Sequence, residues 1–153
     1  MANSASSAPF TIRRASQEDA AAIVALIDLN VPCGELLPRT PDFVRMHAHN
    51  FLIAERDGRV IGCVHLDEYA PSLAEVRSLA VAPEAQGLGA GVALVAALET
   101  LARKRDYTTV FAVSNSGAFF QKLGYQERHI PELDRERSAV SRYKGVHAKD
   151  MQP

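Results

Sequence analysis

The feature that most constrains this chain is a glycine-rich segment, Gln86–Gly91, that lies between a predicted strand and a predicted helix. The strand covers residues 75–81, and Pro83 ends it. The backbone N–H groups of a helix's first turn have no internal partner, and the helix dipole adds positive potential there. The segment therefore predicts a phosphate-binding turn. The helix that follows carries apolar residues at the spacing of one buried face: Leu94, Val95, Leu98, Leu101 and Ala102.

Two common phosphate-binding motifs do not fit this segment. A Walker P-loop requires Gly-Lys-Ser/Thr, whereas Gly91 is followed here by Val92 and Ala93. A dinucleotide-binding G-x-G-x-x-G turn would place its third glycine at the position of Val92. The spacing that fits is Gln-x-x-Gly-x-Gly, formed by Gln86, Gly89 and Gly91.

With this spacing the chain resembles the GNAT (GCN5-related) N-acetyltransferase superfamily, in which the turn binds the pyrophosphate of acetyl-coenzyme A. Residues 119–125, Phe-Phe-Gln-Lys-Leu-Gly-Tyr, are similar to a second GNAT signature. The resemblance implies an α+β fold with a mixed, mostly antiparallel sheet of six to seven strands, flanked by about four helices. Acetyl-coenzyme A is the implied co-substrate.

Composition and charge exclude several other classes of protein. Hydrophobic residues make up 47% and charged residues 23%, as in ordinary soluble globular proteins. A formal charge of −1 without a basic run predicts no nucleic-acid partner, and the lack of a long apolar stretch predicts no membrane span. Cys33 and Cys63 are too few for a disulfide framework, so we expect a cytoplasmic protein. Residues 1–9 are predicted to be a disordered tail and residues 10–153 a single domain.

Local signals set the order of the elements. Ser16 with Asp19 predicts a capped helix whose buried face includes Leu29, and Thr40 before Pro41 predicts another helix start. The expected strands cover residues 10–14, 51–55, 60–66, 75–81, 108–113 and 145–151, with a hairpin turn at residues 57–58.

A closer resemblance covers nearly the whole chain after the tail. Residues 51–81, 110–114, 130–133 and 141–146 are similar to the acetyltransferase domain of N-acetylglutamate synthases. The resemblance implies acetyl transfer to the α-amine of a small amino acid, with L-glutamate as the first candidate. Longer members of that family carry an amino-acid kinase domain, which houses feedback inhibition by arginine. This chain lacks it, so we expect no such feedback.

The resemblance also assigns residues to the acceptor amino acid. Guanidinium groups bind carboxylates through two parallel hydrogen bonds, so a dicarboxylic acceptor favours several cations. The alternative for each arginine is a solvated surface side chain. The expected substrate-binding residues are Arg39, Arg77, Ser78, Arg142 and Lys144, the last standing where the family usually has a serine.

Glu75 is the candidate base, because an α-amine is mostly protonated near neutral pH and must lose a proton. Its alternative is a strand-edge carboxylate in water. The tyrosine that serves many GNAT enzymes as acid is replaced by Phe120, and Ser114 is the preferred substitute, with Tyr143 and Tyr125 as alternatives. The resemblance places a backbone N–H near Leu79 against the acetyl oxygen. The cofactor-binding residues that it implies are Leu79, Ala80, Val81, Gln86, Gly87, Leu88, Gly89, Ala90, Gly91, Asn115 and Phe120.

Two alternatives to acetyl transfer to glutamate stay open at this point. The first is transfer to another amine, namely another amino acid, a polyamine or a protein N-terminus, and the second is a coenzyme-A-binding regulatory module without turnover. GNAT domains often pair through their edge strands, so a homodimer is a further expectation from the resemblance. The five histidines have no metal-ligand spacing, so we expect no metal.

Overall fold

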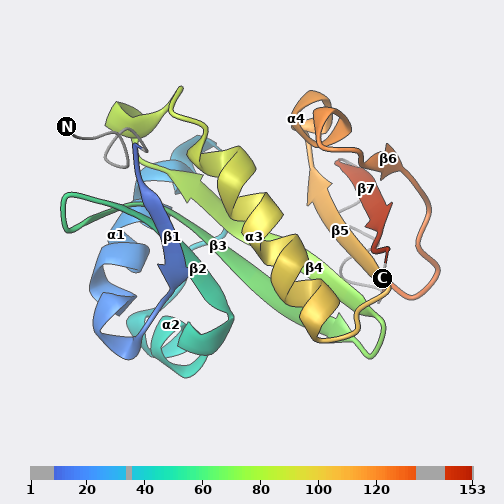
Figure 1. The fold of residues 1–153 in the computed structure, drawn as a ribbon, viewed down its shortest axis with the longest axis horizontal. Helices are drawn as coiled ribbons and strands as arrows, with labels where there is room; N and C mark the ends of the chain where they lie inside the picture. Colours follow the sequence, from blue (N-terminus) through green and yellow to red (C-terminus); the bar gives the residue numbers. More distant parts are fainter. Residues whose placement is uncertain (1–8, 34–35, 134–143, 153) are drawn as a thin grey trace, which may run out of the picture.

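The computed structural model describes residues 9–33, 36–133 and 144–152. These residues form a seven-stranded sheet in the order β1-β2-β3-β4-β5-β7-β6, together with four α-helices (Figure 1). Among the described strands only β4 and β5 pair in parallel, so the expected α+β, mostly antiparallel fold is confirmed. The strands are β1 (Thr11–Arg14), β2 (Phe51–Arg56), β3 (Arg59–Ala70), β4 (Leu73–Val81), β5 (Thr109–Ser114), β6 (Gln126–Glu127) and β7 (Gly145–Asp150). The helices are α1 (Ala20–Asn30), α2 (Pro41–Met46), α3 (Ala90–Lys104) and α4 (Gly117–Lys122).

Local signals place the helix starts and the hairpin correctly. The Ser16 N–H donates to Asp19 Oδ2 at 2.7 Å, and Thr40 Oγ1 accepts from the Phe43 N–H at 3.0 Å. A short 3₁₀ turn, Gln17–Asp19, precedes α1. The predicted burial of Leu29 is wrong, since 62% of this residue is exposed. Ile23, Leu26 and Ile27 already complete the buried stripe, and Leu29 lies beyond its edge.

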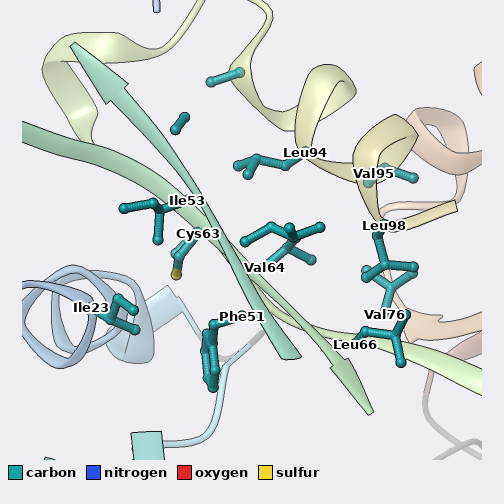
Figure 2. Packing of buried hydrophobic residues seen from close by; sticks show 14 of the residues in the cluster. Ile23, Phe51, Ile53, Cys63, Val64, Leu66, Val76, Leu94, Val95 and Leu98 are labelled. Atoms are coloured by element: carbon teal, nitrogen blue, oxygen red, sulfur yellow. The ribbon is translucent and has the colours of Figure 1, made fainter. Parts of the chain in front are cut away.

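The main core fills both faces of the sheet. Figure 2 shows Ile23 of α1 beside Cys63 on one side of the strands, and Leu94 and Leu98 of α3 on the other side. Cys63 is fully buried, as predicted for a small core residue. No helix in the described part of the chain is both long and apolar enough to cross a membrane.

The central strands β4 and β5 pair over only part of their length. Their register runs from Leu73 opposite Thr109 to Glu75 opposite Phe111, whereas β4 continues to Val81. A bulge in β4 changes its pairing with β3, and Ser78 in this bulge adopts φ 54°. Beyond Glu75 the two strands are no longer paired with each other, and this divergence positions the site described below.

His65 of β3 lies in the core with its ring stacked on Phe51 at 4.5 Å between centroids. Its exposed fraction is 3%. Burial, and then the nearby positive groups of His47 and Arg39, lower its pKa from 6.5 to about 3. Since the folded pKa is the lower one, the unfolded chain binds more protons between these two values. The stability that neutral His65 contributes is complete above pH 6.5 and is lost as the pH falls.

We therefore expect acid to destabilise the protein through His65. Each pH unit below 6.5 is expected to remove about 1.4 kcal/mol of unfolding free energy, or about 2 kcal/mol by pH 5.0. Urea titrations at several pH values measure this slope. The His65→Gln variant should show a shallower slope, whereas His129→Gln, at an exposed histidine, should keep the wild-type slope. An unchanged slope in His65→Gln would assign the acid sensitivity to other groups.

Candidate active site

A cavity of about 800 Å³ lies where β4 and β5 diverge. The elements around it are β4, the glycine turn with the start of α3, the end of β5 with α4, the connection between α1 and α2, and Lys144 at the entry to β7. Fourteen of the residues predicted for the site line this cavity: Arg39, Glu75, Arg77, Ser78, Leu79, Val81, Gln86, Gly87, Gly89, Ala90, Gly91, Ser114, Phe120 and Lys144. Residues far apart in sequence thus share one concave surface.

The glycine turn presents backbone donors to the cavity. Gly87 and Gly89 have φ of 89° and 85°, a left-handed region that disfavours side chains. Gly89 is the N-cap of α3, and the first helical hydrogen bond runs from the Ala93 N–H to the Gly89 carbonyl at 3.0 Å. The first turn of α3 contains no acidic residue, and no side chain of the described residues caps it. The positive potential of the helix start is therefore not neutralised there and suits a phosphate group.

Glu75 is buried, with 1% of its surface exposed, and it lines the cavity from the last position at which β4 pairs with β5. This burial rules out the alternative of a strand-edge carboxylate in water. Asp67 lies opposite Glu75 on β3 and forms an ion pair with Arg77 at 3.6 Å. A buried carboxylate is thus placed at the point where the strands begin to diverge, two residues before Arg77 on the same strand.

Three cationic side chains line the same cavity. The Arg39 guanidinium lies over the Phe43 ring, 4.8 Å from its centroid, an arrangement that orients the planar group. Arg77 comes from β4, and Lys144 immediately precedes β7. All three are partly buried, so the alternative of a fully solvated side chain does not hold for Arg39. Arg142 lies outside the described residues.

The end of β5 brings two serine residues to the cavity. The Ser116 N–H donates to Ser114 Oγ at 2.9 Å, so the Ser114 hydroxyl proton points away from that amide. Phe120 of α4 also lines the cavity and is buried. Tyr125 is not among the lining residues: its hydroxyl donates to Glu99 Oε2 at 2.8 Å, and burial raises its pKa. This placement disfavours Tyr125 as an acid, and Tyr143 lies outside the described residues.

Three predicted cofactor contacts do not line the cavity. Ala80 is buried in the hydrophobic core, and Leu88 packs against the core cluster. Asn115 is likewise not part of the lining. Ala80 alternates with the lining residues Leu79 and Val81, because successive side chains of a strand point to opposite faces. Roles for these three residues stay predictions.

Several lining residues were missed by the sequence reasoning. Six of them are next in sequence to a predicted site residue, which offered a signal, but the others depend on tertiary placement; the six are Val76, Ala85, Val92, Val113, Ser116 and Phe119. The missed residues are Asn30, Leu36, Leu37, Val76, Ala85, Val92, Ala112, Val113, Ser116 and Phe119. Within the described ranges, no group of three or more His, Cys, Asp or Glu side chains is placed to hold a metal ion.

Comparison with known proteins finds acetyltransferases both by family model and by sequence similarity. The model of the acetyltransferase (GNAT) family matches residues 20–125. An uncharacterised N-acetyltransferase from Chlorobaculum tepidum is 34% identical, over 76% of this chain and 75% of the relative. An amino-acid acetyltransferase from Neisseria meningitidis is 36% identical, over 82% of this chain and 30% of the relative.

A solved structure of similar fold is N-acetylglutamate synthase from Neisseria gonorrhoeae, complexed with coenzyme A and N-acetyl-glutamate. Its TM-score is 0.84 and its identity 31%, and the match covers 94% of this chain and 35% of the synthase chain. The chain thus spans about a third of the synthase and of the Neisseria meningitidis enzyme, and about three quarters of the Chlorobaculum protein.

Proposed function

This chain belongs to the acetyltransferase (GNAT) family, and we propose that it moves an acetyl group from acetyl-coenzyme A to the α-amine of a small acidic amino acid, with L-glutamate as the first candidate. The proposal rests on one observation: the groups expected to bind the cofactor and the groups expected to bind the acceptor line the same cavity. The donor-rich start of α3, three cationic side chains and a buried carboxylate all face it. The synthase complexed with coenzyme A and N-acetyl-glutamate supports the same choice of ligands.

The residues of the glycine turn would hold the cofactor. The N–H groups of Gly87, Gly89, Ala90 and Gly91 suit the pyrophosphate, since the start of α3 is uncapped by the described side chains and free of acidic residues. The N–H groups of Gln86 and Leu88 already donate to the carbonyl oxygens of Pro83 and Ala85. β4 beyond Glu75 is not paired with β5, so the Leu79 N–H is proposed to donate to the acetyl oxygen. Acetyl-coenzyme A, when bound, supplies an acetyl thioester whose carbonyl carbon accepts the amine and whose sulfur leaves as thiolate.

Glu75 and Ser114 are proposed to move the protons. Glu75 accepts a proton from the ammonium form of the acceptor, directly or through water, which frees the nitrogen lone pair for C–N bond formation. The Ser114 hydroxyl gives its proton to the sulfur as the C–S bond breaks, and Oγ takes up the second proton that the nitrogen loses as the amide forms. Arg39, Arg77 and Lys144 would hold the acceptor carboxylates.

The test is acetyl-coenzyme-A-dependent thiol release against the twenty amino acids and spermidine, with Arg39 as the probe residue. Release with glutamate is expected, and Arg39→Gln should raise KM for glutamate by about ten- to a hundredfold, the value of a charge-assisted hydrogen bond. Arg45→Gln is the matched control, because Arg45 is exposed, pairs with Asp42 and does not line the cavity. Release only with amines lacking a carboxylate would overturn the acidic acceptor, and binding of coenzyme A without turnover would favour a regulatory module.

Gly89→Ala should weaken coenzyme A binding by about tenfold, because a Cβ at the helix start keeps the phosphate from the backbone donors. Gly58→Ala in the β2–β3 hairpin is the matched control. Both glycines have positive φ, and an added Cβ meets nothing within 4 Å at either site. Each variant should therefore lose about 1–2 kcal/mol of stability from the backbone alone. Calorimetric titration with coenzyme A measures the affinity of each variant, and only Gly89→Ala should bind coenzyme A more weakly. Equal affinities in both variants would contradict a phosphate site at this turn.

A further inference from the structure

His147 of β7 is buried behind the cavity, close to the end of β5. Its exposed fraction is 4%, and its Nε2 lies 3.3 Å from the Ser114 carbonyl oxygen. A carbonyl only accepts, so Nε2 carries a proton and donates it to the Ser114 carbonyl oxygen. Nδ1 is buried without a hydrogen-bond partner among the described residues.

The ring occupies a slot between two glycines and an aromatic residue. It lies nearly parallel to Phe120 of α4, at 6.0 Å between centroids and 10° between planes. A Cβ added to Gly145 would meet Nε2 at 2.8 Å, and one added to Gly117 would meet Cε1 at 3.1 Å. A side chain at position 145 would force the ring to shift, and one at position 117 would push it by a few tenths of an ångström, so the two glycines leave room for the imidazole.

The turn that follows β5 is thereby held from two directions. His147 binds the Ser114 carbonyl, and the Ser116 N–H binds the Ser114 hydroxyl. Ser114, Ser116 and Phe120 line the cavity, whereas His147 does not. The histidine therefore contacts the backbone and the ring beneath the lining residues, and its hydrogen bond reaches the cavity only through Ser114.

The geometry points to His147 as the positioning residue for Ser114: its Nε2–H fixes the Ser114 peptide, and this directs the Ser114 hydroxyl into the cavity. The inference rests on the proposed function, in which that hydroxyl donates to the leaving sulfur. Because Phe120 stands where many GNAT enzymes have a tyrosine, Ser114 is the proposed proton donor, and its orientation decides whether the hydroxyl reaches the sulfur. His147 acts through Ser114 and touches no reacting atom.

Two substitutions separate the hydrogen bond from the packing. His147→Gln keeps an N–H donor near the position of Nε2, whereas His147→Phe keeps a ring against Phe120 and removes the donor. His147→Phe is expected to lower kcat about tenfold, the value of one lost hydrogen bond, with KM for the acceptor unchanged. His147→Gln should recover most of this loss. In a Ser114→Ala background, His147→Phe should change kcat less than twofold, because the two residues act as one unit.

Amide hydrogen exchange tests the same inference without turnover. The Ser116 amide should exchange about tenfold faster in His147→Phe than in the wild type or His147→Gln, while the amides of Leu94 and Val95 in α3 keep their rates. Gly145→Ala should reproduce the faster exchange with His147 still present. Unchanged Ser116 exchange in His147→Phe, equal damage in His147→Gln, or independent effects of His147 and Ser114 on kcat would each overturn the inference. If the wild type turns over no acceptor, the proposed function fails, and the exchange rates still decide the role of His147.

Discussion

Glu75→Gln is expected to lower kcat by about 10²- to 10⁴-fold, the range for removal of a positioned general base. The amide has nearly the same volume as the carboxylate, so packing at this buried position is preserved while proton acceptance is lost. The measurement is steady-state thiol release with the best acceptor between pH 6 and 9. The deficit should shrink as pH rises, because a growing fraction of the acceptor amine is then already neutral.

Coenzyme A affinity serves as the internal control for this variant. Glu75 lies on β4 before the stretch that diverges from β5, whereas the phosphate-binding turn begins at Gln86, so the calorimetric affinity of Glu75→Gln should match the wild type. Retention of kcat within threefold, with an unchanged pH profile, would show that Glu75 is a structural carboxylate and that the proton leaves by another route.

Glu99→Ala is expected to lower the free energy of unfolding by about 3 kcal/mol, the cost of removing one partner from a buried ion pair. Glu99 is 6% exposed on α3. Its carboxylate accepts from the Tyr125 hydroxyl at 2.8 Å and from Lys149 Nζ at 3.1 Å, with Arg103 at 3.8 Å. Lys149 also donates to the Leu123 carbonyl at 2.9 Å. The network joins α3 to β7 and to the end of α4.

Urea unfolding of a small set of variants tests this network. Thr100→Ala, at an exposed position on the same helix, should change stability by less than about 0.5 kcal/mol. The double variant Glu99→Leu with Lys149→Met replaces the ion pair by apolar side chains and should recover part of the loss, because neither charge is then left unpaired while the buried Tyr125 hydroxyl still loses its acceptor. A loss below about 1 kcal/mol in Glu99→Ala would mean that water replaces the carboxylate at little cost.

The features that the sequence determined are those made within a few residues of the chain. Asp57 and Gly58 form the hairpin because both adopt positive φ, as a type I′ turn requires. Thr40 caps α2 through an amide three residues away. The glycine turn leads into α3, as predicted, and Gly89 at the helix start has a left-handed conformation that glycine adopts without strain. These signals depend on local dihedral angles and hydrogen bonds, so they can be read without the fold.

Features that join distant segments depended on the tertiary structure. The burial of Glu75 follows from the register of β4 with β5, and the approach of Arg39 to the same cavity follows from how the α1–α2 connection lies against the sheet. His147 gave no signal in the sequence, because its neighbours Ser114, Gly117 and Phe120 lie about thirty residues earlier and meet it only when β7 pairs with β5. Strand register and side-chain packing are determined by many weak contacts between residues far apart in the sequence. No short motif contains those residues, so a motif cannot predict such contacts.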